Sequence, residues 1–355
     1  MLELPEFREH LNAALDEVLA AHTRAATEFD PLYGELLEHL RQFLARGGKR
    51  LRPYLMYLSF CGSGAPDKAS AGLIRASVSQ ELYHNAWLIH DDLIDRDLVR
   101  YGAPNIAGRY RTKFAQARVA GSRHLADSLA LIAGDINATL ATGLILEAPF
   151  PTEARLAAVA ANTRANFEVF AGETLDVLVP TLEAAEVTTM RLLKLYQAKT
   201  AAYSIRAPLE VGALLAGRPA GRLAAIADFA TPLGIAFQIT DDLLGTFGHE
   251  QELGKSVLSD LREGKRTILH MTALRLATPA ARKRLEASSG NPKAGYHDLA
   301  EIRTIYEACG ARSTTEKLAD EYANQALAAL PGLGYSEPVA RELDRLVRYL
   351  THRTS

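Results

Sequence analysis

Apolar residues recur at intervals of three and four along most of this chain, which is the period of an amphipathic helix and not of a strand. Alanine and leucine dominate and runs of β-branched residues are scarce, so intrinsic preferences also favour helix. The N-terminal part shows the pattern at Leu11, Leu19, Leu36, Leu37, Leu40 and Leu44. The sequence therefore predicts a protein built almost entirely from α-helices.

Clusters of glycine and proline interrupt this pattern and predict turns. They lie at residues 62–66, 149–151, 217–219 and 331–334, with a longer polar loop at 288–292. Pro208 and Pro232 lie in stretches whose apolar period continues past them, so they predict kinks and not helix ends. No linker or internal repeat divides the chain. We therefore expect residues 1–355 to form a single domain, a large helical bundle with its site between core helices.

Composition narrows the class of protein. The chain has 355 residues, 48% hydrophobic and 23% charged, which is enough to bury a large core. Its formal net charge of −2 attracts neither nucleic acid nor an anionic membrane, so neither is expected as a partner. Cys61 and Cys309 have no metal-ligand spacing, which fits a reducing compartment. The N-terminus lacks the pattern of a secretory signal, and the expected location is the cytoplasm.

One stretch, residues 125–146, is strongly apolar, but Asp127, Asp135 and Asn137 interrupt it. A membrane helix needs about 20 consecutive, mostly apolar residues. We therefore expect no segment long enough to span a membrane, and no stable membrane insertion.

Two aspartate-rich segments lie far apart in the sequence, each in an apolar setting. The first is LIHDDLID at 88–95, and the second is FQITDDLL at 237–244. Carboxylates in apolar surroundings are unfavourable unless a cation pairs with them. Asp91 and Asp95 share one face of a helix because they are four residues apart. Clustered carboxylate oxygens suit Mg²⁺, which commonly bridges to substrate phosphates, so two such clusters predict a site for a polyphosphate.

Basic residues supply the complementary charge. GGKRLRP at 47–53 carries Lys49, Arg50 and Arg52, and Lys199-Thr200 lies in an apolar helical run. Two further basic segments, at 254–255 and 264–266, flank Asp260. Arginine and lysine side chains bind phosphate oxygens. The sequence therefore combines acidic sites for metal with basic sites for an anion.

In this order the motifs resemble those of the polyprenyl synthetase family, the trans-isoprenyl diphosphate synthases. The signature runs from GGKRLRP through ELYH and DDLID, Lys199-Thr200 and FQITDDLLG to GKSVLSDLREGKRT, and covers about residues 40 to 330. Five motifs in the right order make coincidence very improbable. The resemblance implies an all-α fold of the isoprenoid synthase type I, with a central cavity, and an enzyme similar to geranylgeranyl or farnesyl diphosphate synthases.

The resemblance also implies a reaction. Isopentenyl diphosphate is condensed with an allylic diphosphate to a longer linear all-trans prenyl diphosphate, and a proton is then lost. Metals and cations stabilise the departing pyrophosphate, while apolar helix walls keep water away from the allylic cation. Three Mg²⁺ ions are expected to join the allylic diphosphate to Asp91, Asp92, Asp95, Asp241 and Asp242.

Other roles carry over from the resemblance position by position. Lys49, Arg52 and His84 match positions that hold isopentenyl diphosphate. Arg100, Lys199 and Lys255 match positions that bind the allylic diphosphate, and Lys265 matches a lysine after the second motif. Thr200 and Gln238 match residues that line the reacting centre, and Lys199 and Thr200 join the aspartates as predicted catalytic residues. Solvated loop charge is the alternative for Lys255 and Lys265, and His90 is interpreted as structural.

Three positions depart from the family pattern. Tyr101 stands where a second arginine is usual, which predicts a weakened site for isopentenyl diphosphate. Arg109, Arg111 and Lys113 either compensate for it or form a solvated face. Gly245 stands where many members have a third aspartate of the second motif, and metal binding is expected to survive this change. Glu173 replaces the usual glutamine before Asp176, which matches a family aspartate.

Ala86 and Trp87 lie about one turn before Asp91 and are either plain core or the floor of the product pocket. A small residue there lets the product grow, so geranylgeranyl diphosphate is favoured over farnesyl diphosphate. Two alternatives remain open: a terpene cyclase of the same fold, and a non-catalytic subunit of a hetero-oligomeric synthase. The GGKRLRP segment argues against the first and the intact first aspartate motif against the second. The family resemblance further implies a homodimer.

Overall fold

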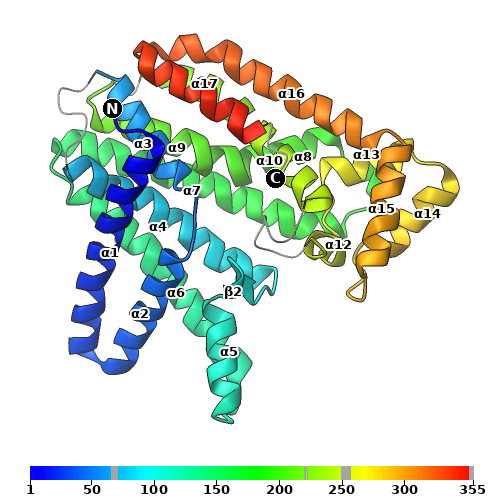
Figure 1. Cartoon of the computed structure of the whole chain (residues 1–355), viewed down its shortest axis with the longest axis horizontal. Helices are drawn as coiled ribbons and strands as arrows, with labels where there is room; N and C mark the ends of the chain where they lie inside the picture. The colour runs from blue at the N-terminus through cyan, green and yellow to red at the C-terminus, as the bar shows by residue number, and fades with distance from the viewer. Residues whose placement is uncertain (65–70, 220, 222, 249–256, 352–355) are drawn as a thin grey trace. The chain divides into compact units, whose positions relative to one another are not determined.

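The computed structural model describes residues 1–64, 71–219, 221, 223–248 and 257–351. Within these residues the regular secondary structure is helical apart from one hairpin of two-residue strands (Figure 1), so the predicted all-α class is confirmed. Contacts divide the chain into two compact units. Unit 1 comprises Met1–Ala160 and Pro208–Ala220, and unit 2 comprises Ala161–Ala207 and Gly221–Ser355. The assignment of residues 1–355 to a single domain stays a prediction.

Unit 1 is built around two long helices, α4 and α6, that run antiparallel. The Tyr83 hydroxyl of α4 is 2.8 Å from Thr142 Oγ1 of α6, and His90 Nε2 is 3.2 Å from the Leu131 carbonyl oxygen. A Cβ at Gly134 would lie 2.2 Å from His90 Nε2, so glycine permits this close approach. These contacts agree with a structural role for His90 and fix the end of α4 where the first aspartates lie. The helices of unit 1 are α1 (Leu4–Phe29), α2 (Pro31–Ala45), α3 (Leu51–Gly62), α4 (Ala71–Ile94), α5 (Ile106–Gln116), α6 (Ser122–Leu146), the start of α7 (Thr152–Leu178) and most of α9 (Ala207–Leu215).

A short hairpin follows α4. Strand β1 (Val99–Arg100) pairs antiparallel with β2 (Ala103–Pro104). The two turn residues, Tyr101 and Gly102, have φ of 55° and 69°. Positive φ at both central residues is the signature of a type I′ turn. The hairpin thereby folds Arg100 back toward the end of α4.

Unit 2 is organised around a segment of π-helix, η3 (Gln197–Arg206), which contains Lys199 and Thr200. A Cβ at Gly172 of α7 would lie 2.3 Å from the Lys199 nitrogen, and one at Gly234 of α10 would lie 2.3 Å from Ala201 Cα. Two glycines therefore let α7 and α10 approach the backbone that carries Lys199. The other elements of unit 2 are η1 (Val179–Thr181), η2 (Ala184–Glu186), α8 (Thr189–Tyr196), α10 (Ala224–Phe247), α12 (Ser259–Glu263), α13 (Ile268–Leu276), α14 (Pro279–Ser288), α15 (Tyr296–Ala308), α16 (Ala311–Ala329), η5 (Leu330–Leu333) and α17 (Glu337–Thr351).

Neither internal proline ends its helical run, as the sequence predicted. Pro232 lies inside α10. Pro208 lies at the start of α9, directly after the π-helical segment that ends at Arg206. Proline cannot donate a backbone hydrogen bond, and the altered bonding of a π segment is one way a helical run accommodates that loss. The kink angles themselves stay predictions. Residues 330–333 form a 3₁₀ helix where a turn was expected.

Helix α6 corrects one expectation. Its length and apolar composition would allow it to cross a membrane, although the polar residues inside it were expected to prevent this. Only 39% of its most apolar stretch is buried. Leu125, Leu131, Ile132 and Leu146 remain exposed on it. A core helix of a soluble protein meets the same criteria, so this finding leaves the predicted lack of membrane insertion open.

Candidate active site

The first aspartate motif separates into buried and accessible carboxylates. Asp92 is 2% exposed. Its Oδ1 accepts a hydrogen bond of 2.9 Å from Arg100 Nε and a second, shorter one from Arg100 Nη2, while Oδ2 accepts one of 2.9 Å from Asn105 Nδ2. Asp91 and Asp95 are partly exposed. Asp92 therefore supports the hairpin and Arg100, whereas Asp91 and Asp95 stay partly accessible to solvent.

Burial and charge act against each other in this group. Burial raises the pKa of Asp92 to about 6, and Arg100 opposes that rise. For Arg100, burial favours the neutral form, but the carboxylates of Asp92, Asp91 and Asp97 together outweigh it and raise the pKa of the guanidinium above its usual value. Arg100 Nη2 also lies 3.7 Å from Asp91 Oδ2. Arg100 is thus a fixed cation at the edge of the first aspartate motif, where the sequence placed a ligand for the allylic diphosphate.

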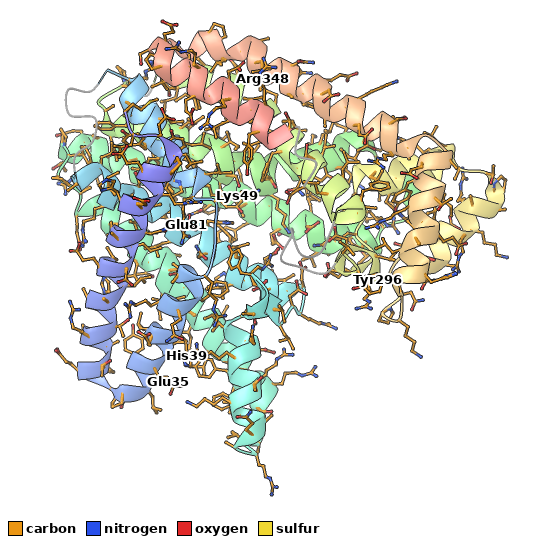
Figure 2. All side chains as sticks on the ribbon, viewed as in Figure 1. Glu35, His39, Lys49, Glu81, Tyr296 and Arg348 are labelled. Carbon is orange, nitrogen blue, oxygen red and sulfur yellow. The ribbon has the colours of Figure 1, made fainter. Side chains whose placement is uncertain are left out.

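The basic loop before α3 is anchored by a buried ion pair between Arg50 and Glu81. Glu81 and Lys49, the loop residue before Arg50, are labelled in Figure 2. Arg50 Nη1 is 2.5 Å from Glu81 Oε1, and its Nη2 donates to the Leu44 carbonyl oxygen at 2.8 Å. Arg50 adopts φ of 55° and Gly48 φ of 114°. A Cβ at Gly48 would lie 2.9 Å from Arg50 Nη1, so glycine is needed there both for conformation and for space. With Arg50 anchored, Lys49 is exposed and can contact an anion.

His84 lies beside the cations predicted to bind isopentenyl diphosphate. Burial, followed by the charges of Arg52 and Arg100, holds the pKa of His84 well below its usual value. The imidazole is therefore neutral near pH 7, and its N–H can donate to a phosphate oxygen. The charges that act on His84 come from Arg52, which the resemblance assigns to the same site, and from Arg100, which it assigns to the allylic site. The role of His84 in binding isopentenyl diphosphate stays a prediction.

Tyr101 packs over the glycine pair of the basic loop. A Cβ at Gly47 would lie 2.9 Å from Tyr101 Cδ1, and the Tyr101 ring is 6.0 Å from that of Phe43. Burial and then Glu81 raise the pKa of its phenol, so the hydroxyl stays protonated. The three cations considered as substitutes for the missing arginine contact other groups. Arg109 donates to Gln42 at 2.6 Å, Arg111 to Asp127 at 2.7 Å and Lys113 to Glu35 at 2.5 Å.

The second aspartate motif shows the same division as the first. Asp241 is exposed and Asp242 is buried. The Tyr196 hydroxyl donates to Asp242 Oδ2, and Gln238 Nε2 donates to Oδ1 at 2.8 Å. Thr200 Oγ1 is 2.6 Å from Gln238 Oε1. Burial raises the pKa of Asp242 to about 7, against the effect of these donors. A chain of hydrogen bonds therefore links the π-helical segment to the second motif.

Lys199 lies between two carboxylates of α7. Its Nζ donates to Asp176 Oδ2 at 2.5 Å and is 3.0 Å from Glu173 Oε2. The three side chains are 15% to 22% exposed, so the group is shielded but open to a ligand. The structure thus connects Lys199 with both the family aspartate and the unusual glutamate.

The structure gives fewer contacts for the remaining predicted site residues. Lys265 Nζ lies 3.2 Å from Glu263 and 3.7 Å from Asp260. Lys255 lies outside the described residues. Ala86 is buried and Trp87 partly buried on α4, and their role in product length stays a prediction.

Sequence reasoning missed three supporting side chains. Tyr196 holds Asp242 across 46 residues, Asn105 holds Asp92 across 13 residues, and Glu81 anchors Arg50 across 31 residues. Only Asn105 carried a local signal, because asparagine is a common helix N-cap. It caps α5 by accepting a hydrogen bond from the Gly108 nitrogen at 2.8 Å.

The carboxylates of both motifs fit a hard divalent cation. Oxygen atoms are the ligands that Mg²⁺ prefers, and Asp91, Asp95 and Asp241 have accessible oxygens. Across the described part of the chain, no three His, Cys, Asp or Glu side chains are arranged to hold a metal by themselves. Mg²⁺ commonly binds one or two carboxylates together with waters and substrate phosphates. Each motif by itself therefore suits a metal that binds together with a diphosphate.

Comparisons with known proteins agree with this chemistry. The sequence model of the family described as polyprenyl synthetase matches residues 34–308. The (2E,6E)-farnesyl diphosphate synthase of Mycobacterium bovis is 33% identical over 86% of this chain and 80% of that protein. The geranylgeranyl diphosphate synthase of Sulfolobus acidocaldarius is 32% identical over 75% of this chain and 74% of that protein.

A solved structure leads to the same conclusion. The geranylgeranyl pyrophosphate synthase of Corynebacterium glutamicum, complexed with isoprenyl diphosphate and magnesium, is similar with a TM-score of 0.93 and 29% identity over 99% of this chain and all of that one. Both the predicted family and the predicted fold are confirmed. This chain belongs to the polyprenyl synthetase family and is a trans-prenyltransferase with the all-α isoprenoid synthase fold.

Proposed function

We propose that the enzyme condenses isopentenyl diphosphate with an allylic diphosphate and that geranylgeranyl diphosphate is its main product. The observation that carries this proposal is the pairing of accessible carboxylates with fixed cations. In unit 1, Asp91 Oδ2 lies 3.7 Å from Arg100 Nη2, and Asp92 holds Arg100 in place. Asp95 follows Asp91 by four residues and is also partly exposed. Such a pairing suits a metal-bound diphosphate, since carboxylates bind the metal and the cation binds phosphate oxygens.

The residues of the chain divide the work as follows. Lys49, Arg52 and His84 bind the diphosphate of isopentenyl diphosphate. Arg100 and Lys199 bind the allylic diphosphate and stabilise the negative charge that grows as its C–O bond breaks. Bound Mg²⁺, expected as three ions held by Asp91, Asp92, Asp95, Asp241 and Asp242, supplies Lewis-acid stabilisation of the same charge. Asp92 and Asp242 also position their neighbours, because each accepts hydrogen bonds from the side chains around it.

The double bond of isopentenyl diphosphate then attacks the allylic carbon, forming a new C–C bond while the allylic C–O bond breaks. Loss of a proton from the condensed product, to the released pyrophosphate, restores a double bond. Thr200 and Gln238, joined at 2.6 Å, would fix polar groups beside the reacting centre.

The proposed product length is argued from two side chains of α4, Ala86 and Trp87. Ala86 is small and lies five residues before Asp91, which supports a product longer than farnesyl diphosphate. Relatives include farnesyl, geranylgeranyl and geranylfarnesyl diphosphate synthases, so the relatives do not decide it. If Trp87 limits the pocket, Trp87→Ala lengthens the product. An unchanged product distribution by chromatography would remove Trp87 as the floor.

The direct test incubates purified protein with Mg²⁺, isopentenyl diphosphate and, separately, dimethylallyl, geranyl or farnesyl diphosphate. Products are dephosphorylated and separated by chromatography. A linear C20 alcohol supports the proposal, and a C15 alcohol replaces the product assignment. Cyclic hydrocarbons, or no product with any primer, refute it.

We further propose that the enzyme is a cytoplasmic homodimer and that α6 contributes to the interface between the two copies. Four apolar side chains on α6 are exposed, namely Leu125, Leu131, Ile132 and Leu146. A second copy of the chain would cover such a face, because burial of apolar area drives association. Light scattering after size-exclusion chromatography gives the mass directly, and a monomeric mass at micromolar concentration contradicts this proposal.

A further inference from the structure

The basic loop at residues 47–50 has an unusual backbone conformation that needs support from its surroundings. Gly48 has φ of 114° and Arg50 has φ of 55°. A residue other than glycine at positive φ is unfavourable and persists only where the surrounding structure holds it. Arg50 is also the N-cap of α3 and lies between Lys49 and Arg52, the two cations assigned to isopentenyl diphosphate. Because Arg50 joins them, its backbone conformation determines how the two cations lie relative to each other.

The side chain of Arg50 is held by three helices. Its Nε donates to Asn12 Oδ1 of α1 at 3.0 Å, in addition to the bonds that its Nη1 and Nη2 make with Glu81 of α4 and the Leu44 carbonyl oxygen of α2. Arg50 and Glu81 are buried, whereas Asn12 is exposed. Asn12 also lies outside residues 34–308, the part of the chain that matches the family model. The buried cluster is therefore joined from the surface by a residue that no motif marks.

Helix α1 is itself fixed at its start by α3. The Leu2 nitrogen donates to the Tyr57 hydroxyl at 2.7 Å, and the Tyr54 hydroxyl donates to the Leu2 carbonyl oxygen at 3.2 Å. The ring of Phe7 lies 5.2 Å from that of Tyr54 and 5.0 Å from that of Tyr57. These contacts hold α1 in a fixed place, so Asn12 offers its amide oxygen to Arg50 from a defined position.

We infer that Asn12 is a positioning residue for the binding of isopentenyl diphosphate. Its amide oxygen holds the Arg50 guanidinium, and Arg50 in turn keeps the basic loop in the conformation that presents Lys49 and Arg52. The inference rests on the proposed function, which assigns these two cations to isopentenyl diphosphate. In this role α1 acts on the site through Arg50 and not by contact with the substrate.

The competing explanation is that Asn12 only ties α1 to the rest of the protein, and three variants separate the two. Asn12→Leu removes the acceptor, and leucine favours helix more than asparagine does, so a weakened α1 cannot account for its effect. Asn12→Asp returns an acceptor at the same place. Asp16→Leu is the matched control, because Asp16 is also exposed on α1 and accepts from Arg41 Nε of α2 at 2.7 Å. It removes a bond between α1 and α2 but leaves Arg50 untouched.

Steady-state kinetics measure the effect on each substrate. Asn12→Leu is expected to raise the KM for isopentenyl diphosphate by about three- to tenfold, since a partly exposed hydrogen bond to a charged group is lost. The kcat and the KM for geranyl diphosphate should stay within about twofold of wild type, because the loop serves one substrate. Asn12→Asp and Asp16→Leu should leave all three constants within about twofold. No rise in Asn12→Leu, an equal rise for both substrates, or an equal rise in Asp16→Leu overturns the inference.

Hydrogen exchange gives a second test that needs no substrate. The Tyr54 nitrogen donates to the Arg50 carbonyl oxygen at 3.2 Å in the first turn of α3. A loosened Arg50 should therefore speed exchange in peptides that contain Tyr54, as followed by mass spectrometry. Asn12→Leu is expected to show this and Asp16→Leu is not; unchanged exchange in the first, or equal acceleration in both, contradicts the inference. A wild type that elongates no primer refutes the proposed function alone, and the exchange rates still decide whether Asn12 holds the loop.

Discussion

Lys199 is held by two carboxylates, and one of them belongs to a residue that departs from the family pattern. Its Nζ donates to Asp176 at 2.5 Å and lies 3.0 Å from Glu173. The usual residue at position 173 is a neutral glutamine of nearly the same size. Glu173→Gln therefore removes a negative charge from Lys199 while it conserves the side-chain volume.

The geometry sets the size of the effect. An ion pair at 3.0 Å is worth roughly 5 to 6 kcal/mol at an effective dielectric constant of about 20. Desolvation of both partners and the remaining carboxylate of Asp176 offset most of this. We take a net value of about 1 to 2 kcal/mol, which corresponds to a factor of about five to thirty in affinity.

Glu173→Gln should therefore lower the KM for the allylic diphosphate by about five- to thirtyfold, because Lys199 becomes available to the phosphate. Little change in kcat is expected, since the gain applies to the ground state and the transition state alike. Steady-state kinetics with geranyl diphosphate varied at saturating isopentenyl diphosphate measure both constants. The gain should shrink at high salt.

Glu168→Gln is the matched control. Glu168 lies on the same helix and pairs with Arg206 at 2.5 Å, away from Lys199. Its replacement changes the net charge equally but should leave the KM for the allylic diphosphate near the wild-type value. If the KM is unchanged or raised in Glu173→Gln, or falls equally in both variants, Glu173 does not restrain Lys199.

Three further outcomes are expected. In metal-free protein, Asp242 binds a proton more tightly when folded, with a pKa of about 7 against 3.8, so its contribution to stability falls as pH rises from about 4 to 7. Asp242→Asn should therefore raise the melting temperature at pH 8 in EDTA, with a gain that shrinks towards pH 5. Arg50→Met leaves the buried Glu81 carboxylate without its partner and should lower the free energy of unfolding by about 3 to 5 kcal/mol in denaturant titrations. Tyr101→Arg restores a cation near the basic loop and should lower the KM for isopentenyl diphosphate; an unchanged KM would show that the site is not weakened.

Local patterns made much of this structure predictable. The three- and four-residue period predicts helices because side-chain burial on one face needs only nearby residues. The same rule placed Asp91 and Asp95 on one face. The basic loop was also recognisable, because its glycines and cations are adjacent in sequence. Its anchor was not, since Glu81 reaches Arg50 from another helix.

Features that depend on tertiary packing could not be predicted from local patterns. The π-helical bonding around Lys199 has no distinct sequence pattern, yet Gly172 and Gly234 allow two helices to pack against it. The approach of Asp260 to Gly245 joins residues of two different helices. Such contacts are set by the fold as a whole, so local sequence patterns do not reveal them.

Helix α6 shows that a local sequence pattern can also mislead. Its sequence predicts that Asp127 and Asn137 make the segment too polar for a membrane helix. In the structure Asp127 pairs with Arg111 at 2.7 Å, and Asn137 is fully buried. Because Asp127 is paired within the protein and Asn137 is buried, these polar residues do not indicate what the exposed face of the helix contacts. The exposed apolar side chains of the helix, Leu125, Leu131, Ile132 and Leu146, are the observation behind the proposed dimer contact.

The two adjacent aspartates of each motif have different surroundings, which suggests a separate role for each. Consecutive residues of a helix point about 100° apart, so a pair cannot serve one ligand from one direction. In both motifs the first aspartate is accessible and the second is buried. Asp92 receives hydrogen bonds from Arg100 and Asn105, and Asp242 receives them from Tyr196 and Gln238. The buried member thus orients the neighbouring cation or polar side chains, while the accessible member has the more open carboxylate for the proposed metal. The residues that support Asp92 differ from those that support Asp242, but in both motifs the second aspartate helps to position the groups around it.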